Sequence, residues 1–298
     1  MSNHPIIFDR ALLKDRQRRA ASLGAATFLI DRVADDMRDR LAAVLREFKL
    51  AADIGTPTDA VVAALADGGS VGTMIAMRPY APEKQVAATV VADEEALPFA
   101  AQSLDLAVSA LALQSVNDLP GVLIQIRRAL KPDGLFLAAM LGGETLTELR
   151  ESMFAAEAEQ EGGASPRVAP FTEVRAAGTL LQRAGFALPV TDVDRVTVRY
   201  ASPVELMNDL RRMGATNPLA ERQRRPMRRA TLQRALEIYA ERFSGPDGRV
   251  RATFDILWLS GWAPHESQQQ PLRPGSARTR LADVLGTREL PAGEKAGH

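Results

Sequence analysis

The chain has 298 residues, a length that allows one large domain or one domain with a substantial insertion, and its 46% hydrophobic and 25% charged residues are typical of a globular protein. Its 37 lysines and arginines balance its 37 aspartates and glutamates, so a formal net charge of zero gives no general attraction to nucleic acid or acidic membranes. Cysteine is absent and there are three histidines, which excludes disulfides, thiolate catalysis and cysteine-ligated metals, and argues against a histidine-rich metal site.

The amino-terminal residues do not form a targeting signal of the secretory type. Residues 1–19 are rich in charge and lack the apolar core of roughly 7–15 residues that such a signal contains. No stretch of the sequence approaches the ~20 apolar residues that a membrane-spanning helix requires. These features predict a cytoplasmic protein without a membrane span.

The first part of the chain has the pattern of amphipathic helices. Residues 8–48 carry apolar side chains at helical spacing, with arginine and aspartate on the other faces. We therefore expect an N-terminal helical prelude over residues 1–48. Lys14 and Arg16 belong to a basic run within it, for which a solvated helix face is the simplest interpretation.

The next segment alternates short apolar runs with helices. Strands are predicted at 50–54, 72–77, 86–91, 104–110 and 135–141. Helices are predicted at 59–66 and 119–130, and the second is followed by a turn at 131–134. This alternation implies βαβ units, a parallel sheet and right-handed crossovers.

The second half of the chain predicts more helices and two longer strands. Helices are expected at 144–160, 172–184, 204–213 and 227–243, and strands at 186–200 and 250–262. The two helices between these strands form a helical insertion at about 203–244. We therefore expect one α/β domain over 49–264, followed by an irregular tail, rich in Gln, Pro, Gly and Arg, over 265–298.

In an open parallel sheet, ligands bind beyond the carboxyl ends of the strands, at the point where the strand order reverses. The polar residues that follow the predicted strands are therefore the candidates for a binding site. They are Asp53 and Gly55 after the first strand, Arg78 after the second, Asp93 and Glu94 after the third, and Gln114 after the fourth.

Several motifs together resemble the S-adenosylmethionine methyltransferase superfamily. They are ADEEALPF at 92–99, LDL at 104–106, VNDLP at 116–120 and LKPDG at 130–134. More narrowly, the chain is similar to the methyltransferase-like assembly factors of respiratory complex I. That likeness is carried by FDR at 8–10, GGETLTELR at 142–150, EGGASP at 161–166, RAGF at 183–186, GW at 261–262 and HESQ at 265–268. It runs from about residue 8 to 277, and the motifs are specific only as a set.

The resemblance implies an α/β fold, namely a Rossmann-like seven-stranded methyltransferase sheet with N-terminal helices and a helical insertion before the last strand. It also implies that S-adenosylmethionine binds at Asp53, Gly55, Asp93, Glu94 and Gln114, with Asp93 beside the adenine amino group. A mitochondrial member of the group is regarded as an arginine hydroxylase acting on a complex I subunit. A partner of that kind is therefore expected, whereas no catalytic residue is assigned.

The sequence departs from the family pattern at three strand ends. The glycine-rich first loop is reduced to Asp53 and Gly55, Met77 and Arg78 stand where an acidic residue would bind the ribose, and Gln114-Ser115 replaces a His-Trp pair. Losing a charged hydrogen-bond acceptor costs roughly 1.5–3 kcal/mol, and crowding the loop adds roughly 1–3 kcal/mol. Together these losses would turn a micromolar site into a roughly millimolar one, so cofactor binding is expected to be weak or lost.

Each candidate residue also has a structural interpretation. Asp93 would orient the turn before the LPF sequence, and Asp53 would stabilise the following helix through its dipole. Pro57 would be the first residue of that helix, a position that proline favours. His265 and Glu266 have the residue types of an acid–base pair, but a structural role near the sheet edge is the simpler interpretation.

The segment 211–234 is unusually basic. Its eight arginines are Arg211, Arg212, Arg222, Arg224, Arg225, Arg228, Arg229 and Arg234, and its one carboxylate is Glu221. Such a segment would dock an acidic partner, such as a complex I subunit or another protein substrate. A solvated face, or pairing with the acidic stretch 31–39, is the alternative. The zero net charge and the lack of interleaved aromatic residues argue against nucleic acid.

Two functions from different classes are therefore open. One is S-adenosylmethionine-dependent modification of a protein side chain by a methyltransferase-like protein with a degenerate cofactor loop. The other is a non-catalytic assembly or binding factor that has kept the fold and lost the cofactor.

Overall fold

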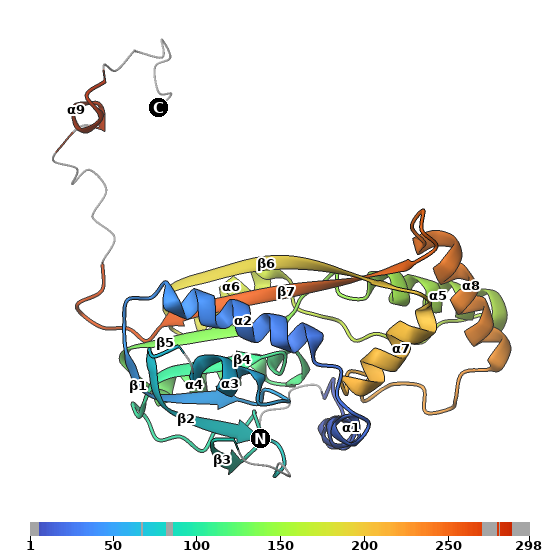
Figure 1. Cartoon of the computed structure of the whole chain (residues 1–298), viewed down its shortest axis with the longest axis horizontal. Helices are drawn as coiled ribbons and strands as arrows, with labels where there is room; N and C mark the ends of the chain where they lie inside the picture. The colour runs from blue at the N-terminus through green and yellow to red at the C-terminus, as the bar shows by residue number, and fades with distance from the viewer. Residues whose placement is uncertain (1–5, 67, 82–85, 270–278, 280, 288–298) are drawn as a thin grey trace. The chain divides into compact units, whose positions relative to one another are not determined.

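A seven-stranded mixed sheet forms the centre of the structure (Figure 1). The computed structural model describes residues 6–66, 68–81, 86–269, 279 and 281–287. The strands are β1 (Phe48–Ile54), β2 (Val71–Arg78), β3 (Ala88–Val91), β4 (Leu104–Ala110), β5 (Leu130–Leu141), β6 (Ala187–Tyr200) and β7 (Val250–Trp262), in the order β3-β2-β1-β4-β5-β7-β6. The first five are parallel, and β7 runs antiparallel to both β5 and β6. The predicted fold class is confirmed.

The strand order reverses between β1 and β4. From β1 the chain builds outward through β2 and β3, and then returns to place β4 on the other side of β1. The loops after β1 and β4 therefore leave the sheet side by side at their carboxyl ends. This is where an open α/β sheet binds its ligands, and it is where the candidate site lies.

Successive side chains along the strands point alternately into two separate hydrophobic layers. On β4, Leu106 and Val108 face one layer, whereas Leu104 and Ala107 face the other. The first layer is covered by α2 (Phe28–Ala42), α3 (Ala60–Ala66), α5 (Thr147–Glu161), α7 (Pro203–Arg212) and α8 (Arg229–Phe243), and the second by α4 (Leu119–Ala129) and α6 (Val174–Arg183). Figure 1 shows α2 crossing in front of the sheet. The near-continuous apolar runs of these strands follow from burial on both faces.

The predicted helical prelude consists of two helices, α1 and α2 (Phe28–Ala42). α1 (Arg10–Ser22) begins at Asp9, whose carboxylate accepts the Leu12 N–H. It ends before Gly24, whose φ of +78° suits glycine and breaks the helical path. α2 then packs on the sheet, while α1 lies beside α7 (Figure 1). The first strand begins at Phe48, two residues before its predicted start.

The helical insertion forms as predicted, between β6 and β7. The amino-terminal half of β7 pairs with β6 alone, because the β5 pairing covers only Ile256–Trp262. This part of the hairpin is covered by α7 and α8, with α8 against α5, and the Tyr239 hydroxyl donates to the Arg251 carbonyl oxygen at 2.8 Å. The insertion therefore builds its own helical layer over the end of the sheet.

The chain divides after Pro264 into two compact units, Met1–Pro264 and His265–His298. The second unit contains the short helix α9 (Leu281–Leu285), in a tail predicted to be irregular, and residues 270–278, 280 and 288–298 of that tail lie outside the described part. Among the described helices, none is long and apolar enough to cross a membrane. The separation of 1–48 from 49–264 as distinct domains stays a prediction.

A matched pair of substitutions on α7 tests whether the insertion belongs to the core. Leu206 is fully buried in the first hydrophobic layer, whereas Val204 on the same helix is 46% exposed. We expect Leu206→Ala to lower the free energy of unfolding by about 2–5 kcal/mol because it leaves a cavity. Val204→Ala should cost less than about 1 kcal/mol. Urea denaturation measures both, and equal small effects would contradict this packing.

Candidate functional site

Asp53, at the end of β1, is fully buried and paired with a cation. Its Oδ2 lies 2.8 Å from Nη1 of Arg78, the last residue of β2, and its Oδ1 accepts a hydrogen bond from the Thr56 hydroxyl. Arg78 is itself 5% exposed, and its Nη2 also donates to the Thr58 carbonyl oxygen at 3.1 Å. Burial raises the pKa of Asp53, and the Arg78 guanidinium opposes part of that rise. The ion pair between Asp53 and Arg78 therefore links the ends of β1 and β2.

Gly55 holds the loop after β1 in a conformation that a side chain would disrupt. Its φ is +75°, and its N–H donates to the Met77 carbonyl oxygen at 3.0 Å. A Cβ at this position would lie 2.6 Å from Cγ and Oε1 of Glu94. Glycine is therefore required both by the backbone and by the close approach of the Glu94 side chain.

Asp93 and Glu94, after β3, bind two cations of α1. Lys14 Nζ lies 2.7 Å from Asp93 Oδ2, and Arg10 Nη2 lies 3.0 Å from Asp93 Oδ1 while also contacting Glu94. Partial burial opposes ionisation of Asp93, but Lys14, the Glu95 N–H and Arg10 hold its pKa below the usual value. Arg10 also donates to the Ser115 carbonyl oxygen at 3.1 Å. α1 is therefore tied to the loops after β3 and β4.

The acids and cations at the strand ends pair with one another. Four carboxylates, those of Asp53, Asp59, Asp93 and Glu94, meet three cations, those of Arg10, Lys14 and Arg78. Within the described part of the chain, the Arg10 Nε is a buried donor without a hydrogen-bond acceptor. The cluster therefore offers an incoming ligand one free buried donor and no free carboxylate.

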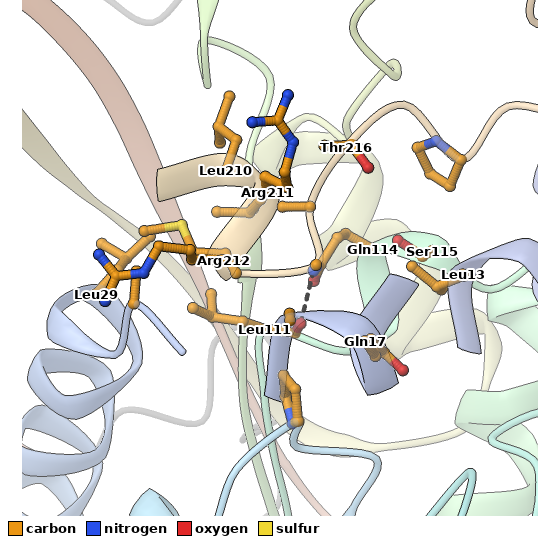
Figure 2. A pocket seen from close by; sticks show the side chains of 18 of the residues that line it. Leu13, Gln17, Leu29, Leu111, Gln114, Ser115, Leu210, Arg211, Arg212 and Thr216 are labelled. Carbon is orange, nitrogen blue, oxygen red and sulfur yellow. Dashed lines mark hydrogen bonds between the residues drawn. The ribbon is translucent and has the colours of Figure 1, made fainter. Parts of the chain in front are cut away.

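Gln114 follows β4 and lines a cavity beside this cluster. Its Nε2 donates to the Leu111 carbonyl oxygen at 2.7 Å (Figure 2). Its buried Oε1 accepts no hydrogen bond from any residue that the structure describes. The cavity has a volume of about 370 Å³ and is lined mainly by apolar side chains. Figure 2 shows Leu13 and Gln17 of α1 on one side of it and Leu210 of α7 on another.

The structure thus brings most of the predicted site residues together. Asp53, Gly55 and Glu94 lie in one cluster, and Asp93 joins them through Arg10. Gln114 lies at the neighbouring cavity. His265 belongs to the second unit, where its Nδ1 lies 2.6 Å from the Ser267 hydroxyl.

Sequence reasoning missed the roles of Arg10 and Lys14. Lys14 was interpreted as part of a solvated helix face, and Arg10 only as part of a family motif. Their partners lie about 80 residues away in the sequence, at separations of 83 and 79 residues from Asp93. The presence of Arg10 in the FDR motif was the one available signal.

The buried pair between Asp53 and Arg78 can be tested by removing one or both charges. Arg78→Met leaves Asp53 as an uncompensated buried carboxylate, so we expect the free energy of unfolding to fall by about 3–5 kcal/mol. The double variant Asp53→Asn/Arg78→Met should lose clearly less, since it buries no lone charge. Urea denaturation of the two variants provides the comparison. Equal instability of both would show that the pair is not the reason for the loss.

A family model described as a methyltransferase domain matches residues 52–138, from Ala52 within β1 to Ala138 within β5. Solved structures show the same fold at low sequence identity. A candidate methyltransferase of Bacillus halodurans superposes with a TM-score of 0.53 at 16% identity, covering 78% of this chain and 99% of that one. The YcgJ protein of Bacillus subtilis gives a TM-score of 0.50 at 14% identity, covering 76% of this chain and 98% of that one.

Curated relatives match along nearly the whole length. The mitochondrial arginine-hydroxylase NDUFAF5 of Danio rerio is 39% identical over 287 residues, covering 93% of this chain and 89% of the relative. The Homo sapiens protein of the same name is 38% identical over 301 residues, covering 97% and 87%. With the methyltransferase fold in place and this identity spread over both halves of the chain, the protein belongs to the family of the NDUFAF5 arginine hydroxylases.

Proposed function

We propose that this protein is a methyltransferase-like factor that binds a protein partner of respiratory complex I assembly and has weak affinity for S-adenosylmethionine. The observation that carries the proposal is the pairing of the strand-end acids Asp53, Asp93 and Glu94 with cations of the chain itself. The partner follows from the resemblance to complex I assembly factors and from the similarity to proteins named arginine hydroxylases. A cytoplasmic location stays a prediction for this chain. The relatives, by contrast, are named as mitochondrial proteins.

The residues at the strand ends do not fit a strong S-adenosylmethionine site as they are arranged. The end of β2 presents Met77, which is buried and apolar, and Arg78, which faces Asp53, so neither accepts a ribose hydroxyl. Asp93 and Glu94 are held by Arg10, and Glu94 lies against Gly55, where a cofactor would approach the loop. A ligand entering here must displace these ion pairs. This cost supports a degenerate cofactor loop.

Titration calorimetry tests the affinity directly. We expect the unmodified protein to bind S-adenosylmethionine with a dissociation constant weaker than about 100 μM, equivalent to less than about 5.5 kcal/mol. Arg10→Met frees Glu94, leaves Asp93 paired with Lys14 alone, and should strengthen the binding. Arg18→Met, which removes an exposed arginine of the same helix, is the matched control and should change nothing. A dissociation constant in the low micromolar range for the unmodified protein contradicts the degenerate site.

The proposed partner surface consists of exposed arginines of the segment 211–234. In the described structure, no ion pair joins this segment to the acidic stretch 31–39, whose own pairs are made with Arg32 and Arg38. Arg212, Arg222 and Arg234 pair with carboxylates elsewhere. Five arginines, namely Arg211, Arg224, Arg225, Arg228 and Arg229, are exposed and make no ion pair with any described carboxylate. Positive charges that are not neutralised within the chain favour binding to an acidic surface of a partner protein.

Charge reversal separates docking from folding. The triple variant Arg225→Glu/Arg228→Glu/Arg229→Glu removes no described ion pair, so its melting temperature should stay unchanged. Co-purification with a complex I subunit or assembly intermediate should be lost. Arg224 is left in place because it also lines a cleft with Arg16 and Arg167. The control, Arg128→Glu/Arg175→Glu/Arg183→Glu, makes the same change of charge on α4 and α6 and should keep the partner.

Retained co-purification of the first triple variant contradicts the partner surface.

The same experiment addresses the second candidate function, modification of a protein side chain. The strand-end cavity, with its unpartnered Gln114 Oε1, is the observation in favour of it. Mass spectrometry of arginine-containing peptides from the co-purified partner distinguishes the two, because a modifying enzyme leaves a covalent mass shift, of one methyl group for a methyltransferase or one oxygen for a hydroxylase, and a non-catalytic factor leaves none.

A further inference from the structure

Four arginines from distant parts of the chain line one cleft next to the apolar cavity. They are Arg16 of α1, Arg167 of the loop after α5, and Arg222 and Arg224 of the loop between α7 and α8. Thr216, Asn217 and Gln223 complete the lining, and the cleft has a volume of about 390 Å³. None of these four arginines belongs to the candidate cofactor site at the strand ends.

Three of the four guanidinium groups are held in place by the protein. Arg16 Nη1 donates to the carbonyl oxygens of Thr216, at 2.9 Å, and of Asn217. Arg222 Nη1 donates to the Leu219 carbonyl oxygen at 2.8 Å, and Arg167 Nε donates to Glu157 at 2.6 Å. Each of these groups keeps further N–H donors, because a guanidinium has five. The cleft is therefore preorganised, and binding an anion requires little ordering of side chains.

The charges in the cleft do not balance. Arg222 lies 3.0 Å from Asp9, and Arg167 pairs with Glu157. Arg16 binds only carbonyl oxygens in the described structure, and Arg224 makes no ion pair there. Burial, followed by repulsion from Arg222, lowers the pKa of Arg16, as expected of a cation beside like charge. Four cations and two carboxylates leave two positive charges unmatched.

The cleft is adjacent to the apolar cavity. Arg167, Thr216 and Asn217 line both spaces. The cavity itself is lined by apolar side chains such as Leu13, Leu29 and Leu210, and Figure 2 shows Thr216 at one side of this space. A ligand that fills both spaces therefore needs an anionic group at one end and an apolar body at the other.

We propose that the cleft and cavity together bind an amphipathic phosphate monoester, with the phosphate among the four arginines and an aliphatic body in the cavity. A phosphate monoester carries about −1.5 to −2 charges near neutral pH, which matches the two unmatched positive charges better than a carboxylate does. Guanidinium groups also bind phosphate oxygens through paired N–H donors. The site shares Arg224 with the proposed partner surface and the cavity with the second candidate function, but it uses neither Arg225, Arg228 and Arg229 nor S-adenosylmethionine, so its test does not depend on the partner.

Isothermal titration of the full chain with octyl phosphate tests the proposal, with octanoate and inorganic phosphate as comparison probes. We expect saturable binding of octyl phosphate, at least about tenfold tighter than either probe, equivalent to about 1.4 kcal/mol. Arg224→Gln, which breaks no described hydrogen bond, should weaken octyl phosphate binding at least about fivefold. Arg175→Gln removes an exposed arginine on α6 and serves as the charge-matched control, with unchanged binding.

Two further variants separate the two halves of the site. Arg16→Gln should weaken binding at least about tenfold, with its melting temperature recorded to exclude unfolding. Ala21→Leu places a larger side chain at the cavity lining and should weaken octyl phosphate but not inorganic phosphate. Equal affinities for octyl phosphate and inorganic phosphate overturn the apolar half. The phosphate subsite is contradicted if octanoate binds as tightly as octyl phosphate. It is also contradicted if the Arg224→Gln variant binds octyl phosphate as tightly as the unmodified protein does.

Discussion

The buried ion pair between Asp53 and Arg78 is the constraint on which the sheet edge depends. Taking two charges out of water costs several kcal/mol each, so the pair persists only because its remaining polar atoms are also bonded. Thr56 supplies one of those bonds and the Thr58 carbonyl oxygen another. The Thr56 hydroxyl in turn accepts the Ala110 N–H at 3.0 Å, which links the loop after β1 to the end of β4. One pair thus joins β1, β2 and β4 at the point where the strand order reverses.

The consequence for function lies in what that edge still offers a ligand. In a methyltransferase-like site, carboxylates at the strand ends serve as acceptors for the cofactor. Here each of them has a cation of the chain as its partner, and two of those cations come from α1. α1 therefore does what a bound ligand would otherwise do, since it satisfies the charge of Asp93 and Glu94. These ion pairs are the physical basis of the proposed weak cofactor binding in a chain that has the methyltransferase fold.

The basic segment between α7 and α8 has two distinct parts. Arg222 and Arg224 meet Arg16 and Arg167 in a cleft beside the apolar cavity. Arg225, Arg228 and Arg229 are exposed and make no ion pair with a described carboxylate. Like charges are costly to gather unless something of opposite sign binds them. A zero net charge for the whole chain therefore conceals a local positive region with a definite position.

The sequence alone determined the fold and the approximate location of the site. Apolar runs of strand length, separated by helical periodicity, predicted the parallel part of the sheet, and two helical patterns between the last two predicted strands marked the insertion that α7 and α8 form. These features are readable because they depend on neighbours within about ten residues. The strand-end residues Asp53, Gly55 and Glu94 were predicted to gather for the same reason, because parallel strands share one carboxyl edge.

Only the tertiary structure decided which charges meet. Arg10 and Lys14 have the spacing of an ordinary helix surface, and nothing in that spacing distinguishes a solvated face from one that binds Asp93 and Glu94. The break after α1, at Gly24, allows α1 to leave the sheet and lie beside α7, and so brings its cations to the strand ends. An ion pair depends on distance in space, and periodicity records only distance along the chain. The same reason hid the arginine cleft, whose members come from three segments separated by more than 50 residues from one another.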